Sequence, residues 1–346
     1  MSTKTMKQWV IKKFTGSFDC LEQTNVPIPE AGENEVLVKF DAVSLNYRDL
    51  IIPLGTYPFP SKEPPVPTSD GAGVVVDVGS KVTQFKKGDH VVTMFFQGHQ
   101  FGDINPVSHK TALGGFLDGC LQEYGAFNEQ GLVHAPKNYS SVESSTITCA
   151  ALTSWNSLYG LKPLKPGQTV LVQGTGGVSI FGLQFAKAAG ATIIATTSSA
   201  AKGEKLKQLG ADHVINYRED KNWGETARKL TPGGFGVDHV LEVGGPGTLE
   251  QSFKCVKMEG VINIIGAVGG AGSEAQPQVI DTLTNVCTVR GIQIGSKALM
   301  LDMIRAIEAN NIRPVVDDKL FTLDEAREAY QYMWDQKHFG KLVIRI

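Results

Sequence analysis

The chain has 346 residues, 42% of them hydrophobic and 20% charged, with 38 glycines, which predicts a compact α/β protein of two domains. A formal net charge of −2 gives no electrostatic reason to expect nucleic acid or a membrane as a partner, so a small-molecule substrate is favoured. Five scattered cysteines without a C-x-x-C pair, no signal-peptide pattern and no long apolar run predict a cytoplasmic protein without disulfides.

The first part of the chain, residues 1–150, has the pattern of a mostly β domain. Short alternating strands broken by Pro and Gly recur there, as in the segments that begin at Glu35 and Gly73. A helical pattern follows at 144–158. We therefore expect a β-rich first domain that ends in a helix.

From about residue 167 the sequence alternates regularly between strands and helices. The expected strands cover 169–173, 192–197, 212–217, 237–243, 260–266 and 288–294. The last expected elements are two helices and a strand, at 297–310, 323–336 and 341–346. Such alternation predicts a doubly wound parallel sheet, a Rossmann domain over 151–295, and we expect 296–346 to complete the first domain.

The stretch from Thr169 to Gly190 joins a strand, a tight glycine turn and a helix without a gap. Small residues in the turn let the backbone approach a phosphate, and the helix directs its unpaired NH groups at the anion. Ser179 replaces the third glycine of a G-x-G-x-x-G pattern. The predicted contacts to a dinucleotide pyrophosphate are Gly174, Thr175, Gly176, Gly177 and Val178. An ordinary glycine-rich loop is the alternative.

The end of the second Rossmann strand lies beside the adenosine ribose in such folds. An Asp or Glu there would bond both ribose hydroxyls and repel a 2′-phosphate, but the chain has no acid between Ala195 and Lys202. The hydroxyls of Ser198 and Ser199 and the cation of Lys202 suit a phosphate dianion, so we predict NADPH as the cofactor. The alternative is that the serines only cap the following helix and that Lys202 is solvated.

The domain order, together with Gly174-Thr-Gly-Gly-Val, resembles the medium-chain dehydrogenase/reductase superfamily over nearly the whole chain. Further matching segments are Ser44-Leu-Asn-Tyr-Arg-Asp, Asp70-Gly-Ala-Gly-Val-Val-Val-Asp, Cys149-Ala-Ala-Leu-Thr-Ser-Trp and His338-Phe-Gly-Lys-Leu-Val-Ile. The resemblance implies a GroES-like catalytic domain, a Rossmann domain that binds NADPH, and hydride transfer to or from a small molecule.

Zinc-dependent alcohol dehydrogenases of this superfamily carry two cysteines and a histidine where this chain has Asn46, Cys149 and Ser69. One soft ligand cannot hold a catalytic zinc, which needs three protein donors. The segment that would carry four closely spaced cysteines for a structural zinc contains only Cys120. We therefore expect no metal.

Without zinc, alcohol oxidation loses the Lewis acid that stabilises an alkoxide. The chain resembles the zinc-independent branch, which includes quinone oxidoreductases and enone and 2-enoyl reductases. There NADPH gives a hydride to a quinone or to an α,β-unsaturated carbonyl, and hydrogen-bond donors meet the charge on oxygen. Two alternatives stay open: a metal-free aldehyde or ketone reductase or alcohol dehydrogenase, and an NADPH-binding sensor or scaffold with little turnover.

Tyr57 and Asn46 are the catalytic residues that the resemblance implies. Tyr57 matches the tyrosine of a Gly-x-Tyr motif, where a phenol can bond or protonate an enolate; a packed aromatic side chain is the alternative. Asn46 offers an amide NH₂ to negative charge, or else caps the helix expected at 48–52. The neighbours Arg48 and Asp49 are expected to form a structural pair.

The remaining cofactor contacts also follow from the resemblance. Thr153 matches a threonine that lies against the nicotinamide, and Tyr217 matches a tyrosine near the adenosine phosphate. The further candidates are Gly266, Ala267, Gly295, Ser296 and Lys341, with a surface position as the alternative for Lys341. We expect a homodimer, formed through an edge strand that begins at Thr288.

Overall fold

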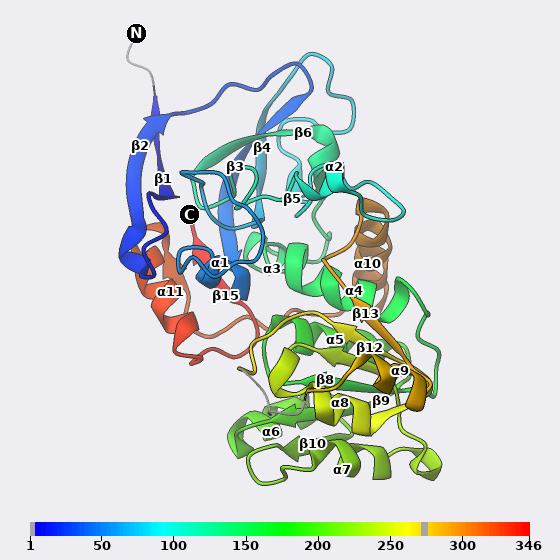
Figure 1. Ribbon diagram of the computed structural model, residues 1–346. Coiled ribbons are helices and arrows are strands. Elements are labelled where there is room, and N and C mark those ends of the chain that lie inside the picture. The colour runs from blue at the N-terminus through cyan, green and yellow to red at the C-terminus, as the bar shows by residue number, and fades with distance from the viewer. Residues whose placement is uncertain (1–3, 271–275) are drawn as a thin grey trace. The chain divides into compact units, whose positions relative to one another are not determined.

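The structure is a computed structural model that describes residues 4–270 and 276–346 (Figure 1). The chain divides into two compact units, one of Met1–Leu152 with Ser296–Ile346 and the other of Thr153–Gly295. We call them the β unit and the Rossmann unit. The chain passes between them at 152/153 and at 295/296, where the sequence predicted 150/151 and 295/296.

The Rossmann unit is built on one parallel sheet. Its strands lie in the order β10-β9-β8-β11-β12-β13, and every neighbouring pair within the described residues is parallel. The strands are β8 (Thr169–Gln173), β9 (Thr192–Thr197), β10 (His213–Asn216), β11 (Val237–Glu242), β12 (Val256–Ile264) and β13 (Thr288–Gly291). The chain runs outward from β8 to β10 and then from β11 to β13 on the other side, so the predicted doubly wound sheet is confirmed.

Helices connect these strands and cover the sheet. They are α4 (Leu152–Tyr159), α5 (Gly177–Ala188), α6 (Ala200–Gln208), α7 (Trp223–Lys229), α8 (Leu249–Cys255) and α9 (Val279–Thr284), with short 3₁₀ turns at Pro232–Gly234 and Gly245–Gly247. Aliphatic side chains on adjacent strands, among them Leu171, Ile194, Val240 and Ile262, are completely buried. Strands that are covered on both faces need such continuous apolar runs, which is why the sequence identified them.

Four strands differ from the prediction at their ends: β10 and β11 by one residue at one or both ends, and β12 and β13 by more. β12 begins at Val256 rather than at 260, because α8 ends at Cys255 and Val256 pairs at once with Val237. β13 ends at Gly291 rather than at 294, because Ile294 has a φ of +54°. That left-handed conformation cannot belong to an extended strand.

The β unit contains a seven-stranded, mainly antiparallel sheet and a separate ribbon of β1 and β2, as far as the described residues show. Its strands are β1 (Thr5–Ile11), β2 (Leu21–Pro27), β3 (Glu35–Leu45), β4 (Asp70–Val78), β5 (His90–Thr93), β6 (Tyr124–Asn128), β7 (Leu132–His134), β14 (Phe321–Thr322) and β15 (Leu342–Arg345). β15 pairs with β3 in a register that sets Leu342 opposite Leu45. The last residues of the chain therefore complete the first domain and lie beside the end of β3.

The helices of the β unit are short except near the end of the chain. They are α1 (Tyr47–Ile51), α2 (Pro106–His109), α3 (Ser141–Ser144), a π-helical turn (Ile147–Ala151), α10 (Lys297–Asn310) and α11 (Ala326–Trp334), with 3₁₀ turns at Phe18–Cys20, Glu129–Gly131 and Leu323–Glu325. The helix predicted at 144–158 is thus interrupted by the π-helical turn before α4 begins. Such turns leave backbone groups free for other partners and are frequent at functional sites.

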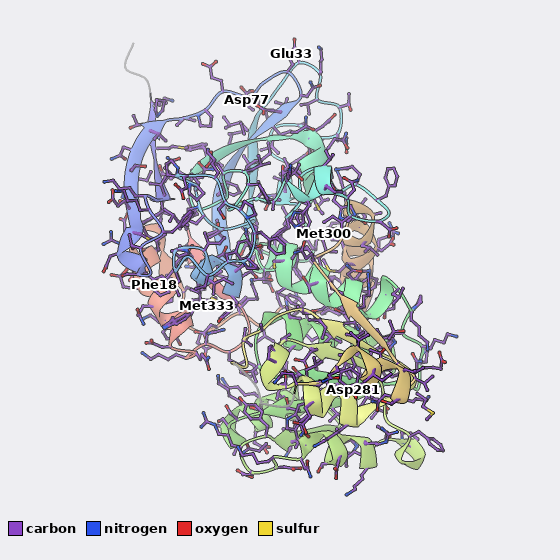
Figure 2. All side chains as sticks on the ribbon, viewed as in Figure 1. Phe18, Glu33, Asp77, Asp281, Met300 and Met333 are labelled. Atoms are coloured by element: carbon purple, nitrogen blue, oxygen red, sulfur yellow. The ribbon has the colours of Figure 1, made fainter. Side chains whose placement is uncertain are left out.

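The core of the β unit lies between its sheet and α11. Phe40, Phe321 and Tyr330 are among its fully buried side chains, and Phe18 and Met333 pack against its edge (Figure 2). In the described part of the chain, no helix combines the length and the apolar character needed to cross a bilayer.

Candidate functional site

The glycine turn after β8 leaves open space beside the start of α5. Gly174 has a φ of +76°, and Gly176 precedes α5 without a side-chain cap. A Cβ built on either glycine would meet no atom within 4 Å. Thr175, Gly177 and Val178 lie in the same half-buried turn. The backbone NH groups at this helix N-terminus are therefore suited to a pyrophosphate.

In the G-x-G-x-x-G pattern the third glycine lets the helix pack closely on the strand. Here Ser179 and Gly182 share this role. The buried Ser179 hydroxyl donates a 2.5 Å hydrogen bond to the carbonyl of Gln173 and so ties α5 to β8. A Cβ on Gly182 would overlap the Leu241 side chain on β11. Close packing of α5 on the sheet therefore depends on Gly182. At Ser179, where the pattern has a glycine, a hydrogen bond joins α5 to β8 instead.

The end of β9 carries the residues expected to meet the adenosine ribose. Ser199 caps α6, because its hydroxyl accepts a 3.4 Å bond from the Lys202 NH, so the capping alternative holds for this serine. Ser198 and Lys202 are half-buried, and the first turn of α6 contains no acidic residue. The Tyr217 NH donates to the carbonyl of Thr197 at 3.0 Å, which brings the partly exposed Tyr217 to the same edge.

A buried acid that the sequence analysis did not single out stands at the end of β11. The fully buried Glu242 carboxylate accepts hydrogen bonds from the side chains of Gln173, Thr248 and Ser252 and from the NH groups of Gly244 and Gly245. It therefore ties the end of β8 to the loop after β11. An acid at the end of an apolar strand, followed by Val-Gly-Gly-Pro-Gly, was the available signal.

The loop after β12 runs alongside the loop after β11. The Val268 NH donates to the carbonyl of Val243 at 3.1 Å, and a Cβ on Gly245 would touch Ala267. Gly266 and Ala267 are therefore on the carboxyl edge of the sheet, where ligands of open α/β sheets bind. Thr153 is buried in the first turn of α4.

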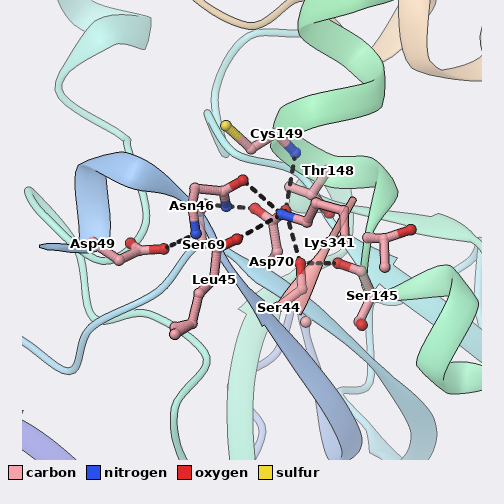
Figure 3. A network of polar contacts seen from close by, with 12 residues as sticks. Ser44, Leu45, Asn46, Asp49, Ser69, Asp70, Ser145, Thr148, Cys149 and Lys341 are labelled. Carbon is pink, nitrogen blue, oxygen red and sulfur yellow. Dashed lines mark hydrogen bonds and ion pairs between the residues drawn. The ribbon is translucent and has the colours of Figure 1, made fainter. Parts of the chain in front are cut away.

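The β unit holds a buried ammonium in a network of polar groups (Figure 3). Lys341 Nζ donates to the carbonyl of Leu45 at 2.8 Å and to Asn46 Oδ1 at 2.6 Å, and lies 3.4 Å from Asp70 Oδ2. The Lys341 side chain is 3% exposed. The surface position weighed for Lys341 is therefore wrong, because the pairing of β15 with β3 carries the residue inward.

Asp70 bonds two of the three positions that the resemblance matches to zinc ligands, Ser69 and Cys149. Its carboxylate accepts bonds from the Ser69 hydroxyl at 2.7 Å, the Ser44 hydroxyl at 3.3 Å and the Cys149 NH at 3.2 Å. The last of these is a backbone group of the π-helical turn. Asp70 is fully buried, so its charge depends on these donors and on Lys341.

Asn46 precedes α1, and both its backbone NH and its side chain form hydrogen bonds. Its backbone NH donates to Asp49 Oδ2 at 2.8 Å, so the N-cap prediction holds for its backbone, whereas its side chain bonds Lys341 instead. Asn46 Nδ2 is buried and has no hydrogen-bond partner in the described residues. Burial raises the pKa of the Asp49 carboxyl to about 6, although Arg48 acts in the opposite direction.

Arg48 and Tyr57 lie together beside α1. The Arg48 guanidinium is 5.3 Å from the centroid of the Tyr57 ring and 4.7 Å from that of Phe95. It donates to the carbonyl of Leu113 at 2.8 Å and lies 3.7 Å from Asp49, as expected of a structural pair. Tyr57 is half-buried and packs on the core, so both its packing role and a polar role remain compatible with its position.

The residues that the resemblance matches to zinc ligands are not a donor set that zinc prefers. Asn46 Oδ1 already bonds an ammonium, and Ser69 supplies only a hydroxyl that bonds Asp70. Burial, and next the Asp70 charge, raise the pKa of the Cys149 thiol above its usual range, which disfavours the thiolate that zinc binds. Within residues 4–270 and 276–346, no three His, Cys, Asp or Glu side chains are grouped to hold a metal ion.

Two further predicted contacts lie where the chain returns to the β unit. Gly295 is the last residue of the Rossmann unit and is buried. The Ser296 hydroxyl accepts a bond from the Leu299 NH at 3.4 Å and so caps α10. The structure thus gives Ser296 a structural role as an N-cap.

Comparison with known proteins identifies the family. Residues 32–137 match the model for an alcohol dehydrogenase GroES-like domain, and residues 177–309 match the model for a zinc-binding dehydrogenase. A zinc-type alcohol dehydrogenase-like protein of Schizosaccharomyces pombe is 46% identical over 344 residues, which cover 98% of this chain and 99% of that protein. The chain therefore belongs to the medium-chain dehydrogenase/reductase superfamily, as the sequence predicted.

Two other similar proteins are an alcohol dehydrogenase and a reductase by name. The solved structure of a putative alcohol dehydrogenase from Sinorhizobium meliloti 1021 has a TM-score of 0.90 and 39% identity, with 100% of both chains covered. The 2-methylene-furan-3-one reductase of Solanum lycopersicum is 33% identical, covering 98% of this chain and 79% of that protein. The chain is thus an alcohol dehydrogenase-like oxidoreductase, from a family that binds a nicotinamide cofactor.

Proposed function

We propose that this chain is a zinc-independent NADPH-dependent reductase that transfers a hydride to a quinone or an α,β-unsaturated carbonyl compound. The observation that carries the proposal is the Lys341 ammonium, which bonds Asn46 Oδ1 in the network around Asp70. A dication beside this ammonium would be repelled, and the network offers it neither a thiolate nor an imidazole. These features support a reaction in which hydrogen-bond donors take the place of a Lewis acid.

The bound cofactor would supply the hydride, and the chain supplies the groups that meet the resulting charge. When a hydride adds to the β-carbon of an enone, an electron pair moves to the carbonyl oxygen. Asn46 Nδ2, which is buried without a partner among the described residues, is the candidate donor to that oxygen. The Tyr57 hydroxyl is the candidate to protonate the enolate. The similarity to a protein named 2-methylene-furan-3-one reductase supports such an acceptor.

NADPH rather than NADH is favoured by the charges at the end of β9. A lysine in the first turn of a helix is opposed by the positive end of the helix dipole, so Lys202 on α6 favours an anion nearby. Ser198 and the partly exposed Tyr217 add polar groups at the same edge. A 2′-phosphate would be attracted by both the lysine charge and the positive end of the helix dipole.

The test is a panel of quinones, enones, enoyl thioesters, aldehydes and alcohols, followed by the change in NADPH absorbance. We expect reduction of quinones or enones that is unaffected by a chelator and by added zinc. Turnover limited to aldehydes and ketones would replace the proposal by a metal-free carbonyl reductase. Tight NADPH binding without any turnover would point to a sensor or scaffold, and activity that requires zinc would refute the metal-free reaction.

We also infer a homodimer formed at the β13 edge of the Rossmann sheet. α9, next to this strand, exposes Val279 at 87%, Ile280 at 54% and Leu283 at 70%. Met258 is exposed at 61%, and a bond from the Glu259 NH to the carbonyl of Val286 brings it to the same patch. An edge strand flanked by so much apolar surface favours a second copy as its partner.

We further infer a cytoplasmic location. The five cysteines, all in described parts of the chain, form no disulfide, which suits the reducing cytoplasm.

A further inference from the structure

The Lys341 ammonium has all its hydrogens engaged inside the β unit. A lysine ammonium offers three N–H donors and no acceptor. Its partners are the carbonyl of Leu45 at 2.8 Å, Asn46 Oδ1 at 2.6 Å and Asp70 Oδ2 at 3.4 Å. No N–H group of Lys341 remains for a cofactor phosphate in this arrangement. The partners of this buried cation therefore indicate a role within the β unit.

The ammonium fixes which way the Asn46 carboxamide faces. Because an ammonium only donates, the amide atom next to it must be the oxygen, which turns Nδ2 to the other side. The Asn46 backbone is held as well, since its NH donates to Asp49 Oδ2 at 2.8 Å. Nδ2 itself is buried and has no partner in the part of the chain that the structure describes.

We propose that Lys341 is a positioning residue, which holds the Asn46 carboxamide so that its Nδ2–H₂ group is presented to the oxygen of the reducible substrate. This inference rests on the proposed function, in which that oxygen gains negative charge. The ammonium acts on the substrate only through Asn46. Its charge polarises the amide, so the opposite N–H bonds become better donors to an oxyanion.

Asp70 holds the other end of this arrangement. Its buried carboxylate attracts the ammonium and also accepts bonds from the Ser69 and Ser44 hydroxyls and the Cys149 NH. A buried ammonium without such a counter-ion would leave an uncompensated charge inside the protein. Asp70, Lys341 and Asn46 thus form a chain in which each group orients the next.

Two substitutions of Asn46 separate donor from acceptor. N46D keeps an oxygen toward Lys341 but removes the Nδ2 donor, whereas N46L removes both. At about pH 8, where an aspartate is ionised, we expect each to lower kcat for enone or quinone reduction about 100-fold. Both variants should melt below the wild type, N46D because it buries a second carboxylate beside Asp70 and N46L because the ammonium loses an acceptor. Wild-type kcat in N46D would refute the orientation.

Removing the ammonium tests the positioning step itself. K341M frees the amide to turn, so kcat should fall about 10-fold or more, with little change in KM, and N46L/K341M should lose no more than N46L alone. The NADPH dissociation constant of K341M, measured by calorimetry, should stay within about twofold of the wild-type value. Additive losses, or a large loss of NADPH affinity, would overturn the proposal and return Lys341 to a cofactor contact.

K341M leaves the Asp70 carboxylate buried without its counter-ion and can lose stability for that reason. The variant D70N/K341M removes both charges together and should show the same fall in kcat, whereas kcat restored to the wild-type value would refute the role of Lys341. Failure of the proposed function is recognised separately, because the wild type would then reduce no enone or quinone.

Discussion

Replacing His239 with leucine should stabilise the Rossmann unit and change how its stability depends on pH. His239 lies in β11, is 1% exposed, and neither of its ring nitrogens has a partner among the described residues. Burial, the dominant cause, lowers the pKa of His239 from 6.5 to about 4, although Asp238 acts in the opposite direction. Its sheet neighbours Val261 and Val170 are apolar, so a leucine would find suitable contacts.

The size of the effect has two parts. An unpaired ring N–H that is buried costs about 1–3 kcal/mol, and leucine removes this cost at any pH. Below about pH 6.5 the unfolded chain binds a proton at this residue that the folded chain binds only near pH 4. The wild type therefore loses stability as the pH falls through this window, by about 1.4 kcal/mol per pH unit and about 3 kcal/mol in all at most. At neutral pH this second part is absent.

Calorimetric melts at about pH 7.5 and about pH 5 measure both parts. We expect H239L to melt higher at both values and to lose less stability on acidification than the wild type. H239Q is the matched control, because it cannot titrate but keeps an unpaired polar group, so it should flatten the pH dependence without the gain at neutral pH. Parallel losses in wild type and H239L on acidification would show that His239 does not titrate as its burial implies.

Four further outcomes are expected. G182A should destabilise the protein by about 1–3 kcal/mol in urea melts because its Cβ overlaps Leu241, whereas G176A should leave apo stability unchanged and weaken NADPH binding in calorimetry. K202A should weaken NADPH binding about tenfold, as after loss of a charged hydrogen bond, without weakening NADH binding. L283E should convert the proposed dimer to a monomer in size-exclusion chromatography, since Leu283 is 70% exposed within one chain. Y57F should lower turnover at unchanged NADPH affinity, and unchanged turnover would leave Tyr57 a packing residue.

The parallel sheet could be predicted from the sequence because its signals are local. The runs at 169–173 and 192–197 are apolar, β-branched and bounded by Gly or Ser, and both strands have the predicted limits. Predictions failed where an interaction from elsewhere ended an element. The helix expected at 144–158 is broken by a π-helical turn whose Cys149 NH bonds Asp70, a residue on a distant strand.

The candidate site was predictable only in part for the same reason. Asn46 and Tyr57 were predicted by motif, since each lies in a short segment that resembles the family. Lys341 in Phe-Gly-Lys-Leu was expected at the cofactor cleft or on the surface, because hydropathy alone places lysine in water. Its burial follows from the register of β15 on β3, which no local pattern states.

Sequence patterns did not predict that the charged side chains of Glu242 and Lys341 are buried. Each is a buried ion whose partners come from several segments: backbone NH groups and hydroxyls for Glu242, and a carboxylate, an amide and a carbonyl for Lys341. A buried charge is tolerated only when such partners are already in place, and removing one of them leaves the ion uncompensated. Each buried ion is therefore a point where the fold holds loops or side chains in one orientation. For Lys341 the group that we propose it orients is Asn46, the position that the resemblance matches to a metal ligand of the zinc enzymes.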